Sequence, residues 1–247
     1  MGGWGVSRSL ARTLAASAVL GAVAGGLVGI LGRLAMRLLA VTSPSTAQGR
    51  ITDDQARVGE ITLTGTLAIV VLTVFAGAML GLAYPLVRRI LPAGTAVRVA
   101  CFGLLTGAIG GSILVHDHPS FDYTVLEPTW LAVTLFISVP AAWGALTALL
   151  VERVDRPEGW VRRLPLLVVV GAGLLVSIPT LLITAVPVAL ALLASLSERL
   201  RTAWASTFLT RLGYVVYAVL LGWAVYGLAT DIWSLAKDSP SRAPFTL

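Results

Sequence analysis

Apolar residues along the chain gather in six long blocks that short polar segments separate. The blocks lie at about 13–40, 62–84, 97–116, 129–151, 164–186 and 212–231. An α-helix rises 1.5 Å per residue, so about 20 apolar residues cross the hydrocarbon core of a bilayer. The pattern predicts an all-α fold, a polytopic transmembrane helical bundle of six spans that forms a single domain over residues 1–247.

The fifth apolar block leaves the span count open, because it continues to about residue 197 and contains Pro179 and Pro187. As one helix it would be roughly 50 Å long, which exceeds one hydrocarbon thickness. In the six-span arrangement this block is one kinked span, and an interfacial amphipathic helix follows at about 188–208, with Trp204 as its anchor. Both termini then lie on one side. In a seven-span alternative, residues 164–197 form a short hairpin, which moves Arg199, Arg201 and Arg211 to the inner side.

The composition excludes a soluble globular protein and argues against nucleic-acid binding. Hydrophobic residues make up 57% of the chain and charged residues 12%, whereas a soluble domain is about one quarter charged. The net charge is +6. However, the basic residues lie at the ends of apolar blocks and are not interleaved with aromatic residues, as a nucleic-acid interface requires.

The arginines also predict the orientation, since cytoplasmic loops are enriched in Lys and Arg. The segment between the third and fourth blocks has no basic residue, so we expect it outside, with the N-terminus in the cytoplasm. Basic residues instead follow the second and fourth blocks, at Arg88, Arg89, Arg98, Arg153, Arg156, Arg162 and Arg163.

Two glycine ladders indicate close helix packing. Small residues at every fourth position let two helix backbones approach closely in a membrane. We expect the two ladders to face each other. Their alignment, together with that of the second and fourth blocks, also indicates a parallel tandem repeat of two-span units, at 12–89 and 98–152. The ladders consist of Gly21, Gly25 and Gly29, and of Gly103, Gly107 and Gly111.

Arg33 and Arg37 continue the first ladder at the predicted outer edge of the bilayer. One interpretation is that both side chains reach lipid phosphates. The other is an outer polar cluster with acidic residues of the outer loops. Those acids are Asp53, Asp54, Glu60, Asp117 and Asp122. His116 and His118 stand beside them, but their spacing matches no closed metal motif, and no metal site is predicted.

The stretches "GRLAMRLLAVTSP" (32–44) and "GRITDDQARVGEITLTGTLAIV" (49–70) resemble a group of small multi-span membrane proteins of actinobacteria. The resemblance covers mainly the first two spans and their loop. It implies a location in the bacterial plasma membrane and carries no activity or functional residue with it.

No catalytic motif or ionisable residue near the middle of a span is evident, so we expect a non-enzymatic membrane protein without a cofactor. Its role would be that of a scaffold, a partner subunit or a lipid-interacting bundle. Its partners would be membrane lipids, a second copy or another membrane protein, and not nucleic acid. Alternatives are a small-solute or lipid transporter, and an enzyme or metal-binding protein that uses the outer polar face.

Overall fold

The computed structural model describes residues 3–51, 57–115, 126–154 and 207–238, and in these ranges the chain is helical apart from short connections. Two 3-10 turns, η1 (Ser45–Ala47) and η2 (Arg88–Ile90), lie in the connections. In the described part, five helices are long and apolar enough to cross a membrane. They are α1 (Gly3–Thr42), α2 (Leu63–Val87), α3 (Thr95–Leu114), α5 (Thr129–Val154) and α9 (Thr207–Asp238).

Five of the six predicted spans coincide with these helices. The apolar portions are Arg12–Thr42, Leu63–Pro85, Thr95–Leu114, Thr129–Arg153 and Arg211–Leu235. The predicted span at 164–186 and nearly all of the predicted interfacial helix at 188–208 lie outside the described residues.

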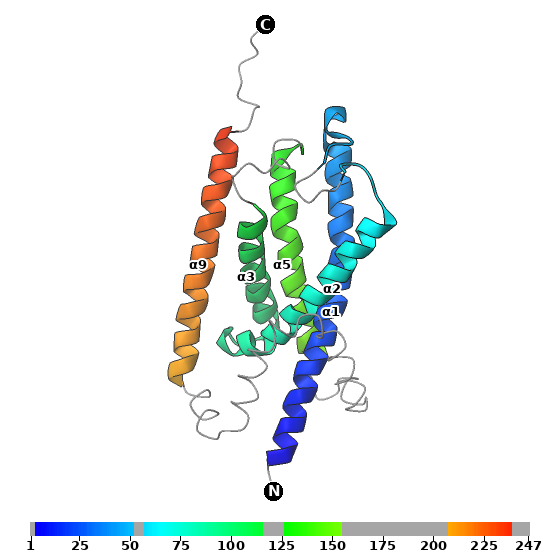
Figure 1. Cartoon of the computed structure of the whole chain (residues 1–247). Helices are drawn as coiled ribbons and strands as arrows, with labels where there is room; N and C mark the ends of the chain where they lie inside the picture. The colour runs from blue at the N-terminus through cyan, green and yellow to red at the C-terminus, as the bar shows by residue number, and fades with distance from the viewer. Residues whose placement is uncertain (1–2, 52–56, 116–125, 155–206, 239–247) are drawn as a thin grey trace.

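The first glycine ladder packs against α2, the next helix along the chain. A Cβ atom at Gly21 would overlap the backbone oxygen of Gly77, and one at Gly25 would overlap the backbone of Thr73. The two backbones therefore touch where α2 crosses α1 obliquely (Figure 1). Beyond this crossing the helices diverge, so the first half of α2 lies to one side of α1.

The second ladder packs against α5 in the same manner, with Gly103 and Gly107 against Ala141. In the described part, α1 and α3 make no substantial contact with each other. The prediction that the two ladders face each other is therefore wrong. Each ladder packs instead on its sequence neighbour, which supplies small residues of its own at the crossing point. We call α1 and α2 the first helix pair, and α3 and α5 the second helix pair.

Helix α9 runs parallel to α3. Gly213 lies against Ile90 near the start of α3, the hydroxyl of Tyr217 donates to the carbonyl oxygen of Cys101 (2.9 Å), and Leu228 lies near Gly111. The six-span arrangement with both termini on one side requires the opposite direction. The structure places the start of α1 and the end of α9 at opposite ends of the bundle (Figure 1).

We call the end at which α1 begins the amino end, and the opposite end the far end. Helices α2 and α5 finish at the amino end, and α3 and α9 begin there (Figure 1). At the far end, the hydroxyl of Ser43 accepts the Glu127 N–H (3.0 Å), which joins the end of α1 to the start of the α5 segment. Buried clusters around Leu39 at the far end and around Tyr84 at the amino end complete the core.

Candidate functional site

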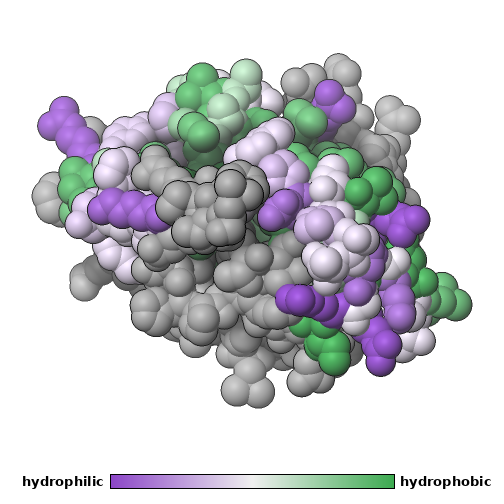
Figure 2. Space-filling model, turned by 90° about the horizontal axis from the view of Figure 1, so that it is seen from above, coloured by the Kyte–Doolittle hydropathy of each residue, from purple (hydrophilic) through white to green (hydrophobic). Residues whose placement is uncertain are grey.

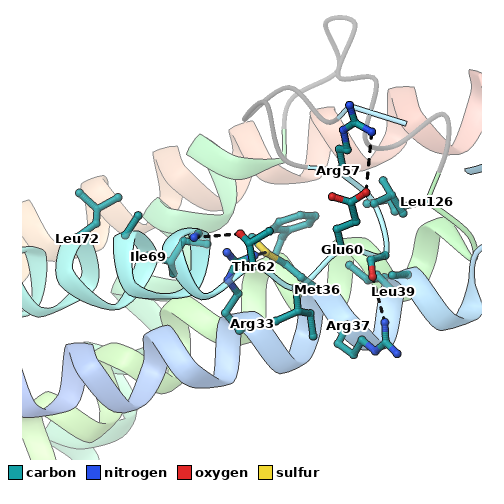
Figure 3. Close-up of a pocket in the computed structure, with 17 residues that line it drawn as sticks. Arg33, Met36, Arg37, Leu39, Arg57, Glu60, Thr62, Ile69, Leu72 and Leu126 are labelled. Carbon is teal, nitrogen blue, oxygen red and sulfur yellow. Dashed lines mark hydrogen bonds and ion pairs between the residues drawn. The ribbon is translucent and has the colours of Figure 1, made fainter. Parts of the chain in front are cut away.

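A cleft of about 610 Å³ lies at the far end, between the last turns of α1 and the first half of α2 (Figure 3). It exists because α2 diverges from α1 beyond their glycine crossing. We call it the far-end cleft. Its lining includes Arg33, Met36, Arg37, Leu39, Ala40, Arg57, Val58, Gly59, Glu60, Ile61, Thr62, Gly65, Ala68, Ile69, Leu72, Leu126 and Phe136.

The start of α2 is built to receive the side chain of Arg33. The hydroxyl of Thr62 accepts the N–H of Gly65 (3.1 Å) and so caps the helix. A Cβ atom at Gly65 would overlap the guanidinium of Arg33. Figure 3 shows Arg33 rising from α1 towards Thr62, with Met36 beside it. The missing side chain at position 65 therefore leaves the space that the guanidinium occupies.

The cleft carries excess positive charge. Glu60 pairs with Arg57 at 3.9 Å, and both side chains are more than half exposed. Arg37 donates to the carbonyl oxygen of Gly59 (3.2 Å). The Nε atom of Arg33 is buried and has no hydrogen-bond partner among the described residues. Within the described part of the chain, no carboxylate pairs with Arg33 or Arg37, so none of these residues supplies an anion to balance the two guanidinium groups that line the cleft.

Beneath the arginines the walls of the cleft are apolar, formed in part by Ile69, Leu72 and Phe136. Leu72 also has 68% of its surface exposed. A residue that both lines the cleft and faces outwards shows that the cleft opens sideways, between α1 and α2. If these helices span a bilayer, this side opening faces the acyl chains.

The surface at the far end, like the cleft, combines polar and apolar residues. Figure 2 looks down on the far end and shows hydrophilic residues gathered on the right, on the side of α1 and α2, next to hydrophobic residues. An amphiphilic ligand, with an anionic headgroup and an apolar tail, matches this juxtaposition better than a wholly polar solute does.

The structure brings only part of the predicted outer polar cluster together. Arg33, Arg37 and Glu60 all line the far-end cleft, but Glu60 pairs with Arg57 rather than with either of the other two arginines. The remaining acids of that prediction lie outside the described residues, as do the two histidines; these are Asp53, Asp54, Asp117, Asp122, His116 and His118. Among the residues that the structure describes, no group of metal-ligating side chains is large enough to hold an ion.

A second polar site lies at the amino end, around the carboxylate of Glu152 near the end of α5. Its Oε1 atom accepts a hydrogen bond from the hydroxyl of Tyr84 (2.8 Å) and lies 2.8 Å from Nε of Arg88. Nη1 of Arg98 is 3.5 Å from the same atom. The Glu152 side chain is only 5% exposed. We call these four residues the Glu152 cluster.

The Glu152 cluster ties three elements to α5, because Tyr84 belongs to α2, Arg88 to η2 and Arg98 to α3. A buried carboxylate is costly unless opposite charges and hydrogen-bond donors surround it. Here two guanidinium groups and one hydroxyl supply that compensation. The rings of Phe102 and Tyr84 pack in a T-shaped arrangement with 5.0 Å between centroids, which helps to hold the Tyr84 hydroxyl towards Glu152.

Neither Glu152 nor Tyr84 is predicted from the sequence as a site residue. One signal was present: Gly144, Ala148 and Glu152 stand four residues apart, and the first two are buried. Positions four apart share one face of a helix, so a ridge of small buried residues points its next member into the bundle as well. Arg33 likewise follows Gly29 by four residues and therefore lies on the same face of α1.

Comparisons with known protein families, with curated proteins and with solved structures find no match to this chain.

Proposed function

We propose that this protein is a non-enzymatic, lipid-interacting helical bundle of the bacterial plasma membrane, with its amino end in the cytoplasm. Five apolar helices support an integral membrane protein. The concentration of arginines after the second and fourth predicted spans supports the orientation. In this orientation the far-end cleft opens towards the outer leaflet.

The observation that carries the proposal is the pairing of Arg33 and Arg37 with apolar walls that open sideways. Guanidinium groups form strong, charge-assisted hydrogen bonds with phosphate oxygens. A lipid that entered between α1 and α2 would place its phosphate at the arginines and its acyl chains along Ile69 and Leu72. The ligand is therefore an anionic phospholipid of the outer leaflet.

The test is lipid retention by the purified full-length chain. We expect the chain, in mixed micelles, to bind phosphatidylglycerol more tightly than phosphatidylcholine. Arg33→Gln and Arg37→Gln should each weaken the binding of phosphatidylglycerol about tenfold, the effect of losing one charge-assisted hydrogen bond. Arg153→Gln removes an exposed arginine at the amino end and serves as the matched control. Equal losses in all three variants would mean that the general positive charge binds the lipid and that the cleft does not.

A lipid transporter is the second candidate, because equivalent positions are in contact in the first and in the second helix pair. In the first pair, residues 17, 21 and 25 lie against Gly81, Gly77 and Thr73. In the second, residues 103, 107 and 111 lie against Ala145, Ala141 and Ile137. Each contact in one pair has its counterpart in the other, at constant spacings of 86 and 64 residues along the chain.

This shared register supports a parallel tandem repeat, in which an axis along the membrane normal relates the two pairs. The alignment of the second and fourth apolar blocks in the sequence pairs Gly81 with Gly144. In the structure the counterpart of Gly81 is Ala145, one residue further along the chain. Transporters built from such repeats hold their substrate at the interface between the two units. The far-end cleft satisfies this condition in part, because Leu126 and Phe136 precede or belong to the second pair and line the cleft with α1 and α2.

A further inference from the structure

The far-end cleft changes from apolar to charged along its length. Figure 3 shows Leu72 and Ile69 at one end of the cleft and Arg33 beside Thr62 in its middle. Glu60 lies at the other end. Thr62 precedes Leu72 by ten residues, which is about 15 Å along the axis of α2. A phospholipid presents acyl chains, phosphate and headgroup in the same order, so a phosphate at Arg33 directs its headgroup towards Glu60.

The backbone at Glu60 is held in place by the turn that precedes α2. The N–H of Glu60 donates to the carbonyl oxygen of Arg57 (3.2 Å), and Arg37 of α1 donates to the carbonyl oxygen of Gly59 (3.2 Å). Gly59 has a φ of 88°, a conformation that glycine adopts without strain. The turn therefore fixes Glu60 at the rim of the cleft and leaves only its side chain to move.

The carboxylate of Glu60 is available to a ligand. Its contact with Arg57 is 3.9 Å long, and the two side chains are 56% and 60% exposed. Such an exposed pair contributes little free energy, because water screens both charges. An ionised carboxylate only accepts hydrogen bonds. It therefore attracts a headgroup that carries donors and repels one that carries further anionic oxygens.

We propose that Glu60 determines the headgroup specificity of the far-end cleft, and that it selects a phospholipid with hydroxyl groups beyond the phosphate, such as phosphatidylglycerol. The inference rests on the proposed lipid binding. The phosphate lies at the arginines, and a glycerol hydroxyl of the headgroup donates to Glu60. The same carboxylate discriminates against phosphatidic acid, whose phosphomonoester has no such hydroxyl and carries a charge of about −1.5 to −2 at pH 7.

The net charge of the cleft discriminates against a zwitterionic lipid. Among the described lining residues, Arg33, Arg37 and Arg57 outnumber the single carboxylate of Glu60. The ammonium group of phosphatidylethanolamine can also donate to a carboxylate, but it cancels the negative charge that the arginines attract. Phosphatidylglycerol keeps this charge and adds neutral donors, so it matches both features of the site.

The test is competition between lipids with identical acyl chains for the purified full-length chain in mixed micelles. The three lipids are phosphatidylglycerol, phosphatidic acid and phosphatidylethanolamine. Glu60→Gln removes the charge and keeps the shape of the side chain. Glu127→Gln is the matched control, because Glu127 is also exposed at the far end but does not line the cleft. Arg33→Gln reports separately on whether the lipid occupies the cleft.

We expect the unmodified chain to bind phosphatidylglycerol more tightly than either other lipid. Glu60→Gln should lower the preference for phosphatidylglycerol over phosphatidic acid about tenfold, because a charge-assisted hydrogen bond becomes a neutral one and the repulsion of the second lipid is lost. Glu127→Gln should leave this preference unchanged. The unfolding temperature of Glu60→Gln should equal that of the unmodified chain, since the ion pair that it removes is exposed.

An unchanged preference in Glu60→Gln, or an equal change in Glu127→Gln, would overturn the proposal. Tighter binding of phosphatidylethanolamine than of phosphatidylglycerol by the unmodified chain would overturn it as well. If Arg33→Gln weakens the binding of phosphatidylglycerol while Glu60→Gln leaves the preference intact, only the role of Glu60 fails. If Arg33→Gln binds phosphatidylglycerol as tightly as the unmodified chain does, the proposed function fails, and the inference fails with it.

Discussion

At the scale of single residues, two ridges of small side chains end in a charged residue, and the local surroundings decide what each charge does. Arg33 follows Gly29 and lies in the space that Gly65 leaves open at the far-end cleft. Glu152 follows Ala148 and is enclosed by Tyr84 and two arginines. The first charge remains available to an anionic ligand, whereas the second is neutralised within the bundle.

The enclosure of Glu152 predicts a graded loss of stability. Glu152→Gln leaves two arginines without their shared carboxylate, and breaking such a buried pair costs about 3–5 kcal/mol. Tyr84→Phe removes one hydrogen bond to a charged group, which costs about 2 kcal/mol. Thermal unfolding of the purified chain in one detergent should rank the variants in this order. A larger loss in Tyr84→Phe than in Glu152→Gln would contradict the assigned role of the carboxylate.

At the scale of helices, backbone contact holds each helix pair together. Lipid chains are as apolar as leucine side chains, so helices in a bilayer gain little from hydrophobic burial and depend on close packing. Glycine at the crossing of α1 and α2 permits that approach, and the oblique crossing then makes the two helices diverge at the far end (Figure 1). The packing of the first helix pair thus creates the cleft.

Because of this packing, the glycines differ in how well they tolerate substitution by alanine. Gly21→Ala places a methyl group on the backbone oxygen of Gly77, and the helices must separate to admit it. We expect a loss of roughly 1–3 kcal/mol, typical of overpacking. Gly222→Ala in α9 is the matched control, because its new Cβ would meet no atom within 4 Å. It should be neutral or stabilise by about 0.5–1 kcal/mol, since alanine favours a helix more than glycine. Unfolding temperatures that rank the two variants the other way would refute the close contact.

At the scale of the whole molecule, the direction of α9 constrains the threading of the chain. Helix α5 ends and α9 begins at the amino end, and α9 runs parallel to α3 (Figure 1). Of the two arrangements predicted from the sequence, the seven-span one gives α9 this direction, whereas the six-span one requires α9 to run antiparallel to α3.

The direction of α9 can be tested with three exposed positions, each changed to cysteine in a Cys101→Ser background, which removes the chain's only cysteine. Ala93 lies at the amino end, whereas Ser45 and Lys237 lie at the far end. In intact cells, we expect an impermeant maleimide to label Ser45→Cys and Lys237→Cys but not Ala93→Cys. If Lys237→Cys behaved like Ala93→Cys, the parallel direction of α9 would be refuted.

The sequence by itself determined the membrane-spanning class and the positions of five helices. Long apolar blocks can satisfy their backbone hydrogen bonds in lipid only as helices, so their boundaries follow from hydropathy alone. The glycine ladders likewise indicate close packing of helices from the sequence alone. These properties depend on residues that are near each other along one helix.

Tertiary structure alone decided which helices touch, which way α9 runs and where the charges meet. The spacing of Gly21 and Gly25 shows that something packs on that face, but every neighbouring helix with small residues is an equal candidate. Glu152 reads as a loop charge in the sequence because Tyr84 and Arg98 are distant along the chain. The cost of burying a carboxylate is offset only by groups from other helices, so no local pattern can reveal that the site is stable.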